Sequence, residues 1–458
     1  MTEELILKKA KIVTRDGIIE GSLIVEGEKI KEIVSGDVNG ETGKVIDLGG
    51  KHVMAGLVDG HVHFNEPGRT HWEGYETGSR AAAAGGVTTV LEMPLNATPP
   101  TITRELLKEK RDTVKDKSVI DFGNWGGLVD NNVEHIEGMH EDGVVAFKAF
   151  LSNSGVDFER INDDRLYAGL KLSKQLGTVM GLHAENEFVT TLLSQQLKDA
   201  GRTDRAAWYE SRPPETELEA IQRASYWAGV TGGNLHVVHI TIGDGIRHLD
   251  EAKGEGVHVT TETCPHYLYF DHQDFEEIGP GAKCAPPIRS RETVEDLWDC
   301  VLNGQVDVIN SDHSPCEWKD KEQGMDNIWK AWGGITGIQT QLSVLLSEGV
   351  NKRGLLLEDL SRMVSENPAK IYGLYPRKGV IAPGSDADLV VVDLDEEWTF
   401  TTDQMFSRNQ HSAYGGRTFK GKVLQTYVRG KLVYDNGKIV ADKGYGKMLR
   451  REMPYRFN

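Results

Sequence analysis

Short β-favouring segments alternate with amphipathic segments through the middle of the chain. The expected strands lie at 57–63, 87–92, 119–123, 144–150, 178–183, 235–240, 257–261 and 306–311. Between them, apolar residues recur with helical spacing at 73–84, 104–115, 164–176, 217–228, 243–252 and 291–302. Eight such units in about 250 residues predict an α/β protein with a closed (β/α)8 TIM-type barrel, rather than an open doubly wound sheet.

Both ends of the chain have a different pattern, in which short strands are separated by glycines and no helical period is present. These strands are expected at 5–7, 11–13, 22–25 and 29–33, and again at 387–392, 423–428 and 432–434. Because chain termini often lie close together, we expect both ends to form one small β-sandwich. The predicted domains are residues 1–52 and 377–458 for the β-sandwich and C-terminal tail, and residues 53–376 for the barrel.

Composition narrows the class of protein. A net charge of -18 over 458 residues argues against nucleic acid or an anionic membrane as partner. The start of the chain, Met1 to Glu4, lacks the basic and apolar parts of a signal peptide, and no apolar run approaches membrane-spanning length. The four cysteines have no disulfide-scaffold or Cys-x-x-Cys spacing. We therefore expect a cytoplasmic protein with reduced thiols and no membrane contact.

Candidate metal ligands stand at the ends of the expected barrel strands, where the active sites of such barrels lie. His61 and His63 are two residues apart on one strand, so their rings should point to the same side. The full set comprises four histidines, a lysine and an aspartate: His61, His63, Lys148, His183, His239 and Asp312. Each alone has a structural explanation, such as a hydrogen-bonded core histidine, an ion pair or a helix cap. Their coincidence at one end of the barrel favours a metal-dependent active site.

Three further histidines are less certain. His236 precedes His239 by three residues in one strand, so we expect it to face the opposite side and to be structural. His266 and His313 lie in loops over the same mouth and are expected to line it without necessarily touching metal.

Longer phrases around these residues resemble the cyclic amidohydrolases of the amidohydrolase superfamily, which include dihydroorotase, hydantoinase, dihydropyrimidinase and allantoinase. The resemblance covers essentially the whole chain and is greatest to the allantoinases. It is carried by residues 66–78, 264–267 and 311–316, and by the phrase 378–389 that leads back into the β-domain.

The resemblance implies two divalent metal ions. His61, His63 and Asp312 would bind the buried ion, His183 and His239 the more exposed one, and Lys148, as N6-carboxylysine, would bridge both. Zinc is expected, with cobalt, iron, manganese and nickel as alternatives that these donor types accept. A metal-bridging hydroxide, with Asp312 as proton shuttle, would open the hydantoin ring of allantoin to give allantoate in purine catabolism. Relatives are commonly homotetramers, so a homo-oligomer is expected by analogy.

The identity of the cyclic amide depends on departures from the family patterns. Similar dihydroorotases have an arginine at position 65 and an asparagine at position 95, whereas this chain has Asn65 and Leu95, which suits an uncharged substrate. Asn153 replaces a tyrosine of D-hydantoinases and suits a ureido tail. Main-chain groups near Ala285 and Gly333 are expected to contact the imide ring. The alternatives are a hydantoinase or dihydropyrimidinase acting on 5-substituted cyclic ureides and, less favoured, a non-catalytic scaffold of the same fold, because scaffolds lose ligands that this chain retains.

Overall fold

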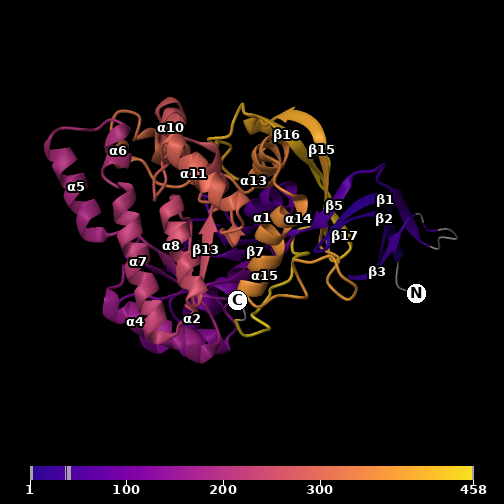
Figure 1. The fold of residues 1–458 in the computed structure, drawn as a ribbon, viewed down its shortest axis with the longest axis horizontal. Coiled ribbons are helices and arrows are strands. Elements are labelled where there is room, and N and C mark those ends of the chain that lie inside the picture. The colour runs from indigo at the N-terminus through magenta and orange to yellow at the C-terminus, as the bar shows by residue number, and fades with distance from the viewer. Residues whose placement is uncertain (1–3, 37, 39–42, 456–458) are drawn as a thin grey trace.

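Parallel strands and the helices around them occupy the middle of the chain in the computed structural model (Figure 1), and these strands form a closed barrel. The structure describes residues 4–36, 38 and 43–455, so Met1 to Glu3 lie outside the described residues. The barrel strands are β6 (Leu57–Val62), β7 (Val87–Glu92), β8 (Asp121–Asn124) continued by β9 (Gly126–Gly127), β10 (Phe147–Phe150), β11 (Met180–His183), β12 (Leu235–Val237), β13 (Val259–Thr263) and β14 (Val308–Ile309). Each predicted strand overlaps an observed one, which confirms the predicted fold class.

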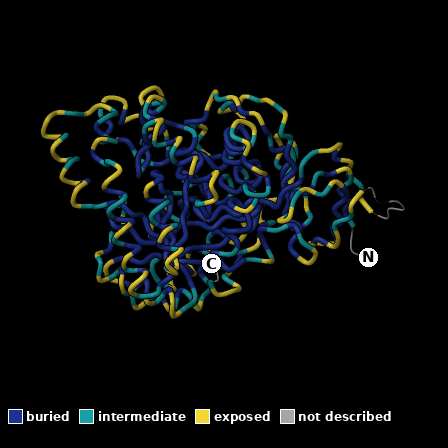
Figure 2. The backbone as a smooth tube through the Cα atoms, viewed as in Figure 1, coloured by how far each residue is buried: buried dark blue, intermediate teal, exposed yellow. Residues whose placement is uncertain are grey.

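The barrel closes where the segment after β14 meets β6. Val62 forms a parallel bridge with His313, and the amide of His63 donates to the carbonyl of His313 at 2.8 Å. Every residue of β6, β7, β10 and β11 is buried, as expected for parallel strands that are covered on both faces. The tube in Figure 2 is accordingly dark blue through the barrel, with exposed positions on the surrounding helices and loops.

Helices surround the barrel and follow most of the predicted ranges. They are α1 (Tyr75–Ala84), α2 (Arg104–Val114), α3 (Ile136–Glu141), α4 (Asp163–Leu176), α5 (Glu187–Asp199), α6 (Ala206–Glu210), α7 (Pro214–Thr231), α8 (Gly243–Gly254), α9 (Pro265–Tyr269), α10 (His272–Ile278), α11 (Arg291–Leu302), α12 (Trp318–Glu322), α13 (Gln341–Val344), α14 (Leu357–Ser361) and α15 (Asn367–Ile371). Helix α5 was not predicted from the sequence, although Val189, Leu193 and Leu197 recur in it with helical spacing, and Thr190 is its one buried residue.

Both ends of the chain meet in one sheet, which confirms that the two termini together build the small β-domain. The N-terminal strands are β1 (Glu4–Thr14), β2 (Gly17–Glu26), β3 (Lys29–Ser35), β4 (Lys44–Asp47) and β5 (His52–Ala55), and the C-terminal ones are β15 (Leu389–Thr399), β16 (Thr418–Val428), β17 (Lys431–Asp435) and β18 (Lys438–Ile439). The sheet order is β18-β17-β16-β15-β5-β1-β2-β3, with β4 paired to β1. Antiparallel pairing of β5 with β15, from Ala55 opposite Leu389 to His52 opposite Val392, joins the two ends.

A buried ion cluster connects this sheet to the barrel. Lys378 Nζ lies 2.6 Å from Asp121 Oδ2 of β8, 2.6 Å from Asp388 Oδ2 and 2.9 Å from Asp386 Oδ2. Arg429, which follows β16, pairs with the other oxygen of Asp121. Because isolated buried charges are costly, this arrangement holds only while the barrel and the sheet keep their mutual position.

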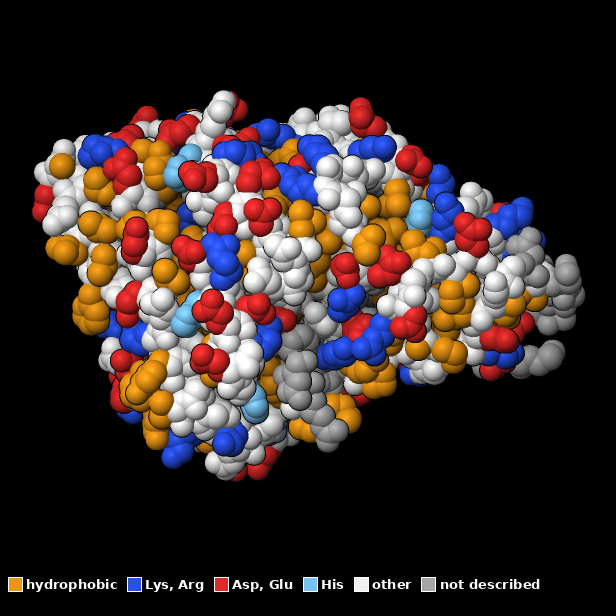
Figure 3. Space-filling view, viewed as in Figure 1, with side chains coloured by type: hydrophobic (Ala, Val, Ile, Leu, Met, Phe, Trp, Pro, Cys, Tyr) orange, Lys and Arg blue, Asp and Glu red, His pale blue; other side chains and the backbone are white. Residues whose placement is uncertain are grey.

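The surface carries mixed charge. On the face drawn in Figure 3, acidic side chains lie among basic ones over most of the area. Within the described part of the chain, no helix combines the length and the apolar character needed to cross a membrane.

Candidate metal centre

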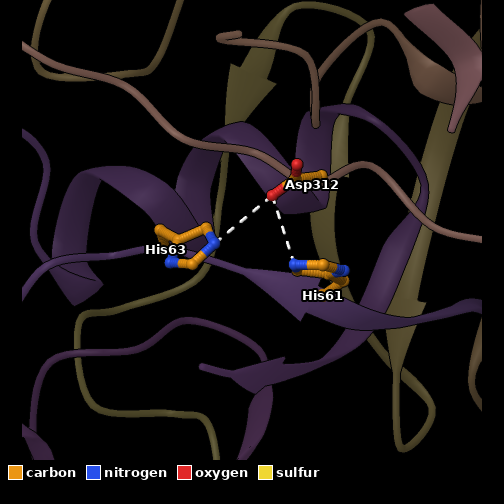
Figure 4. A group of neighbouring side chains, drawn as sticks. All are labelled: His61, His63 and Asp312. Atoms are coloured by element: carbon orange, nitrogen blue, oxygen red, sulfur yellow. Dashed lines mark ion pairs between the residues drawn. The ribbon is translucent and has the colours of Figure 1, made fainter. Parts of the chain in front are cut away.

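Three of the predicted ligands meet at the end of β6 (Figure 4). Asp312 Oδ1 lies 3.2 Å from His61 Nε2 and 3.3 Å from His63 Nε2. The two rings share one side because they are two residues apart in an extended segment, as predicted. The side chains of His61 and His63 are buried and that of Asp312 is partly exposed, and their donor atoms lie within 4.8 Å of one another, close enough to bind one ion.

Two of the predicted ligands lie just beyond the end of a strand, in left-handed backbone. His239 follows β12 with φ 42°, and Asp312 follows β14 with φ 43°. Such a conformation costs a non-glycine residue about 1–3 kcal/mol and persists where the surrounding structure imposes it. At both positions it directs the side chain into the pocket at the barrel mouth.

A second pair of donors lies beside the first group. His183 ends β11, and its Nδ1 is 3.0 Å from Nε2 of His239. The His239 ring centroid is 5.4 Å from that of His61, so the four histidine rings form one continuous group.

Lys148, in β10, is fully buried beside this group. Its Nζ has no hydrogen-bond partner within the described part of the chain and lies 5.0 Å from the centroid of the Phe150 ring. Burial lowers the pKa of Lys148 to about 8, although the charges of Asp312 and Glu262 oppose this shift. The amine is therefore much closer to its neutral form at physiological pH than an exposed lysine.

Hydrogen bonds on the side away from the centre fix which nitrogen of three of the rings faces it. Three rings donate one N–H to an oxygen acceptor: His61 Nδ1 to Glu262 Oε1 (2.7 Å), His63 Nδ1 to the Leu95 carbonyl (3.0 Å) and His183 Nε2 to Glu185 Oε2 (2.7 Å). In a neutral imidazole the opposite nitrogen then carries a lone pair. That nitrogen points into the centre in each case, which is how metal-binding histidines are commonly oriented.

The residues predicted to contact substrate surround the same centre. Asn153, Ala285 and Gly333 line the pocket that contains all six candidate ligands. Trp332 also lines it, and its ring lies 4.7 Å from that of Trp72. The pocket therefore brings the predicted ligands and the predicted substrate contacts together.

The sequence model of the amidohydrolase family matches residues 52–433. The chain belongs to the amidohydrolase family. It is 42% identical over 451 residues to an allantoinase of Deinococcus radiodurans, covering 98% of this chain and 99% of that protein. It is 41% identical over 451 residues to an allantoinase of Escherichia coli K12, covering 97% and 98%.

Solved structures show the same amidohydrolase fold. An L-hydantoinase (dihydropyrimidinase) from Arthrobacter aurescens superimposes with a TM-score of 0.95 at 37% identity, covering 98% of this chain and 100% of that one. A dihydropyrimidinase from Brevibacillus agri gives a TM-score of 0.92 at 30% identity, covering 99% and 100%. Amidohydrolases are metal-dependent, and the cluster of His61, His63 and Asp312 is a candidate ligand group.

Sequence reasoning missed two residues of this amidohydrolase site, Glu262 and Glu185. The strand predicted at 257–261 ended one residue before Glu262, whereas β13 continues to Thr263. Burial opposes the charge of Glu262, but the neighbouring His61 and His236 hold its pKa below the usual range. A charged residue between threonines at the end of a barrel strand was the signal available in the sequence.

The orientation of His236 differs from its prediction, whereas its hydrogen bonds agree with the predicted structural role. Its Nε2 is 3.2 Å from Glu262 Oε2 and 3.3 Å from the Tyr372 hydroxyl, so the ring points into the barrel and not to the opposite side. The alternation argument failed because the left-handed backbone at His239 breaks the regular strand between the two histidines.

The two loop histidines have different surroundings. His266 is buried near the centre, grouped with Cys264 and Asp312, and its Nε2 has no partner among the residues described. His313 is turned away, because its Nε2 lies 3.4 Å from Glu73 and its Nδ1 accepts from the amide of Gly337.

Proposed function

We propose that the protein is a metal-dependent hydrolase that opens the hydantoin ring of allantoin to give allantoate. The relatives named allantoinase, at 41–42% identity over nearly the whole chain, support this substrate. The observation that carries the proposal is the convergence of all six candidate ligands in one pocket at the barrel mouth.

The donor set fits two divalent ions. His61, His63 and Asp312 would hold one ion, and His183 and His239 the other. The lone pairs of the oriented rings point inward, and the buried Nζ of Lys148 lacks a partner among the described residues, as expected if that atom is completed by a further group. We propose zinc, with cobalt, iron, manganese and nickel as alternatives for these nitrogen and oxygen donors. When bound, such ions polarise a carbonyl and lower the pKa of a water molecule.

Lys148 is proposed to carry the bridging group. Its neutral amine would attack the carbon of carbon dioxide, forming an N–C bond and releasing one proton, to give a carbamate with one negative charge over two oxygens. An ammonium group cannot bind a cation, whereas a carbamate can bridge two. Burial of Lys148 supplies the neutral amine that this reaction requires.

Asp312 is the proposed proton carrier. Burial opposes its charge, but His61 and His63 hold the pKa of Asp312 below the usual range, so it is ionised at neutral pH. It takes a proton from the attacking water as the water oxygen adds to the ring carbonyl carbon. It then returns that proton to the ring nitrogen as the C–N bond breaks, leaving a ureido group and a carboxylic acid that releases its own proton to solvent to become a carboxylate.

The surroundings of Asn65 and Asn153 favour an uncharged ureide. The buried Asn65 side chain donates to the Pro315 carbonyl and accepts from Asn96, which lines the pocket, so amides stand where dihydroorotases have a guanidinium. Asn153 lines the pocket and offers an amide that matches a ureido tail.

Hydantoinase or dihydropyrimidinase activity is the second candidate. It is favoured by the TM-score of 0.95 with a solved L-hydantoinase (dihydropyrimidinase). The two candidates share the chemistry of ring opening and differ in the substituent on the ring.

Steady-state rates on allantoin, unsubstituted hydantoin and dihydrouracil separate these candidates. We expect kcat/KM to be at least about tenfold higher for allantoin, which corresponds to about 1.4 kcal/mol from recognition of the ureido tail. A preference for hydantoin or dihydrouracil would contradict the assignment. Absence of both turnover and bound metal would instead indicate the scaffold class.

A further inference from the structure

Arg212 pairs with Glu185, the carboxylate that accepts a hydrogen bond from His183. His183 and His239 form the half of the candidate metal centre proposed to hold the second ion. Nη1 of Arg212 is 2.6 Å from Oε2 of Glu185, and the same oxygen is 2.7 Å from Nε2 of His183. The guanidinium carbon is 4.6 Å from the centroid of the Trp208 ring, which restricts its orientation. Glu185 is completely buried, so this arginine compensates a charge that water does not reach.

The backbone at Arg212 is also linked by hydrogen bonds to the segment that follows His239. The carbonyl of Arg212 accepts a hydrogen bond from Arg289, whose Nη2 is 2.8 Å from Glu217 Oε2. Glu217 in turn accepts from the amide of Thr241 at 2.7 Å, two residues after His239. The connection between α6 and α7 thus reaches both His183 and His239.

The ring of His61 in the other half of the centre is held by a different carboxylate. Glu262, which accepts from His61, also contacts His236, Asn310 and the backbone amide of His239, and no arginine pairs with it among the described residues. A change at Arg212 therefore acts on His183 without reaching the support of His61.

We propose that Arg212 is a positioning residue for the ion held by His183 and His239, and that it acts through Glu185. This inference rests on the proposed function, because it requires these histidines to bind metal. With Arg212 in place, the Glu185 carboxylate is fixed against His183 and keeps Nδ1 of that ring directed at the ion. Without the guanidinium, Glu185 is a buried charge with no cation beside it, and the ring loses this fixed acceptor.

The test compares Arg212→Met with the unaltered protein. Methionine keeps an apolar side chain over Trp208 and removes the charge. Chelator-treated protein is titrated with Co²⁺ while visible absorption and bound metal per chain are recorded. We expect the first ion to bind as in the unaltered protein and the second to bind about 10–100-fold more weakly, the usual effect of losing an outer partner of a metal ligand.

Two further variants and a control make the result specific. Arg212→Lys keeps the charge and should recover part of the affinity for the second ion. Glu185→Gln should repeat the selective loss even if Arg212→Met fails to fold. Arg202→Met is the matched control, because Arg202 pairs with Asp204 and Glu210 near α6, at side chains that are more than one third exposed, and should leave both ions unchanged.

The outcomes distinguish this inference from the proposed function. Equal weakening of both ions, unchanged binding of both, or the same loss in Arg202→Met would overturn the role of Arg212 while leaving the hydrolase intact. An unaltered protein that binds no metal and does not hydrolyse allantoin would remove the proposed function itself.

Discussion

Asp312 contacts two histidines and also has the geometry of a proton carrier, so its two roles can be separated by removing its charge. Its Oδ1 lies 3.2 Å from His61 Nε2 and 3.3 Å from His63 Nε2, and asparagine keeps the size of the side chain and one oxygen acceptor.

We expect Asp312→Asn to bind metal largely as before and to lose about 10²–10⁴-fold in kcat, the usual contribution of general acid–base catalysis. The measurement is kcat on allantoin together with metal content. Near-normal kcat in this variant would show that the proton follows another route.

The lowered pKa of Lys148 gives a pH dependence with a definite sign. Below about pH 8 the amine is mainly protonated, and its neutral fraction rises as the pH increases through this value. Chelator-treated, carbon dioxide-free protein should therefore regain activity faster above pH 8 than below it, when metal and a fixed concentration of dissolved carbon dioxide are supplied. A reactivation rate independent of pH between 7 and 9 would contradict carbamate formation at a buried lysine.

Removing the Lys148 amine tests the bridge directly. Lys148→Ala should lose bound metal and activity, because the bridging anion is gone, and short-chain carboxylic acids should partly restore both by occupying the vacated space. Metal content is measured by elemental analysis with and without added acetate. Full retention of metal without any added acid would exclude a bridging role.

For single residues, the sequence predicted which side chains converge but not which hydrogen-bond partners orient them. His61, His63 and Asp312 were identified because ligand-type residues stood at strand ends. Glu185 and Glu262 were missed, because their roles depend on which ring nitrogen each carboxylate faces, and that follows from three-dimensional packing.

Among the elements, the segment between β15 and β16 reaches from the β-domain to the barrel mouth. Asn409 donates from Nδ2 to the carbonyls of His71 (3.0 Å) and Trp72 (2.7 Å). Trp72 packs against Trp332, which lines the candidate site. A loop of the β-domain therefore supports one wall of the pocket.

Asn409→Ala should raise KM for allantoin by about fivefold, the factor that corresponds to about 1 kcal/mol for a net hydrogen bond, with metal content unchanged. Asn351→Ala is the matched control, because that amide bonds three backbone carbonyls near β16 and not at the mouth. Equal KM values in the two variants would mean that the loop does not shape the site.

Element prediction succeeded where the hydrophobic period was strong and failed where burial was weak. The apolar runs of β6, β7 and β11 were located from sequence because these strands are buried on both faces. Helix α5 was missed although Val189, Leu193 and Leu197 recur with helical spacing, and most of its side chains are exposed or half-buried. The left-handed residues His239 and Asp312 carry no sequence signal of their backbone, since neither is glycine.

For the whole molecule, the barrel is an insertion within a β-domain that the two chain ends complete. The pairing of β5 with β15 and the buried cluster around Lys378 fix the barrel against that domain. A homotetramer in the cytoplasm remains a prediction from resemblance, and light scattering of the purified protein tests the oligomeric state.

The central claim is that two ions held by six side chains of one barrel mouth open a cyclic amide. The most direct measurement is the rate of allantoin hydrolysis by chelator-treated protein as zinc or cobalt is added stepwise. The account predicts no turnover without metal and a plateau at about two equivalents per chain, the number that the two groups of ligands would hold. Full activity after complete metal removal, or a plateau at one equivalent, would contradict it.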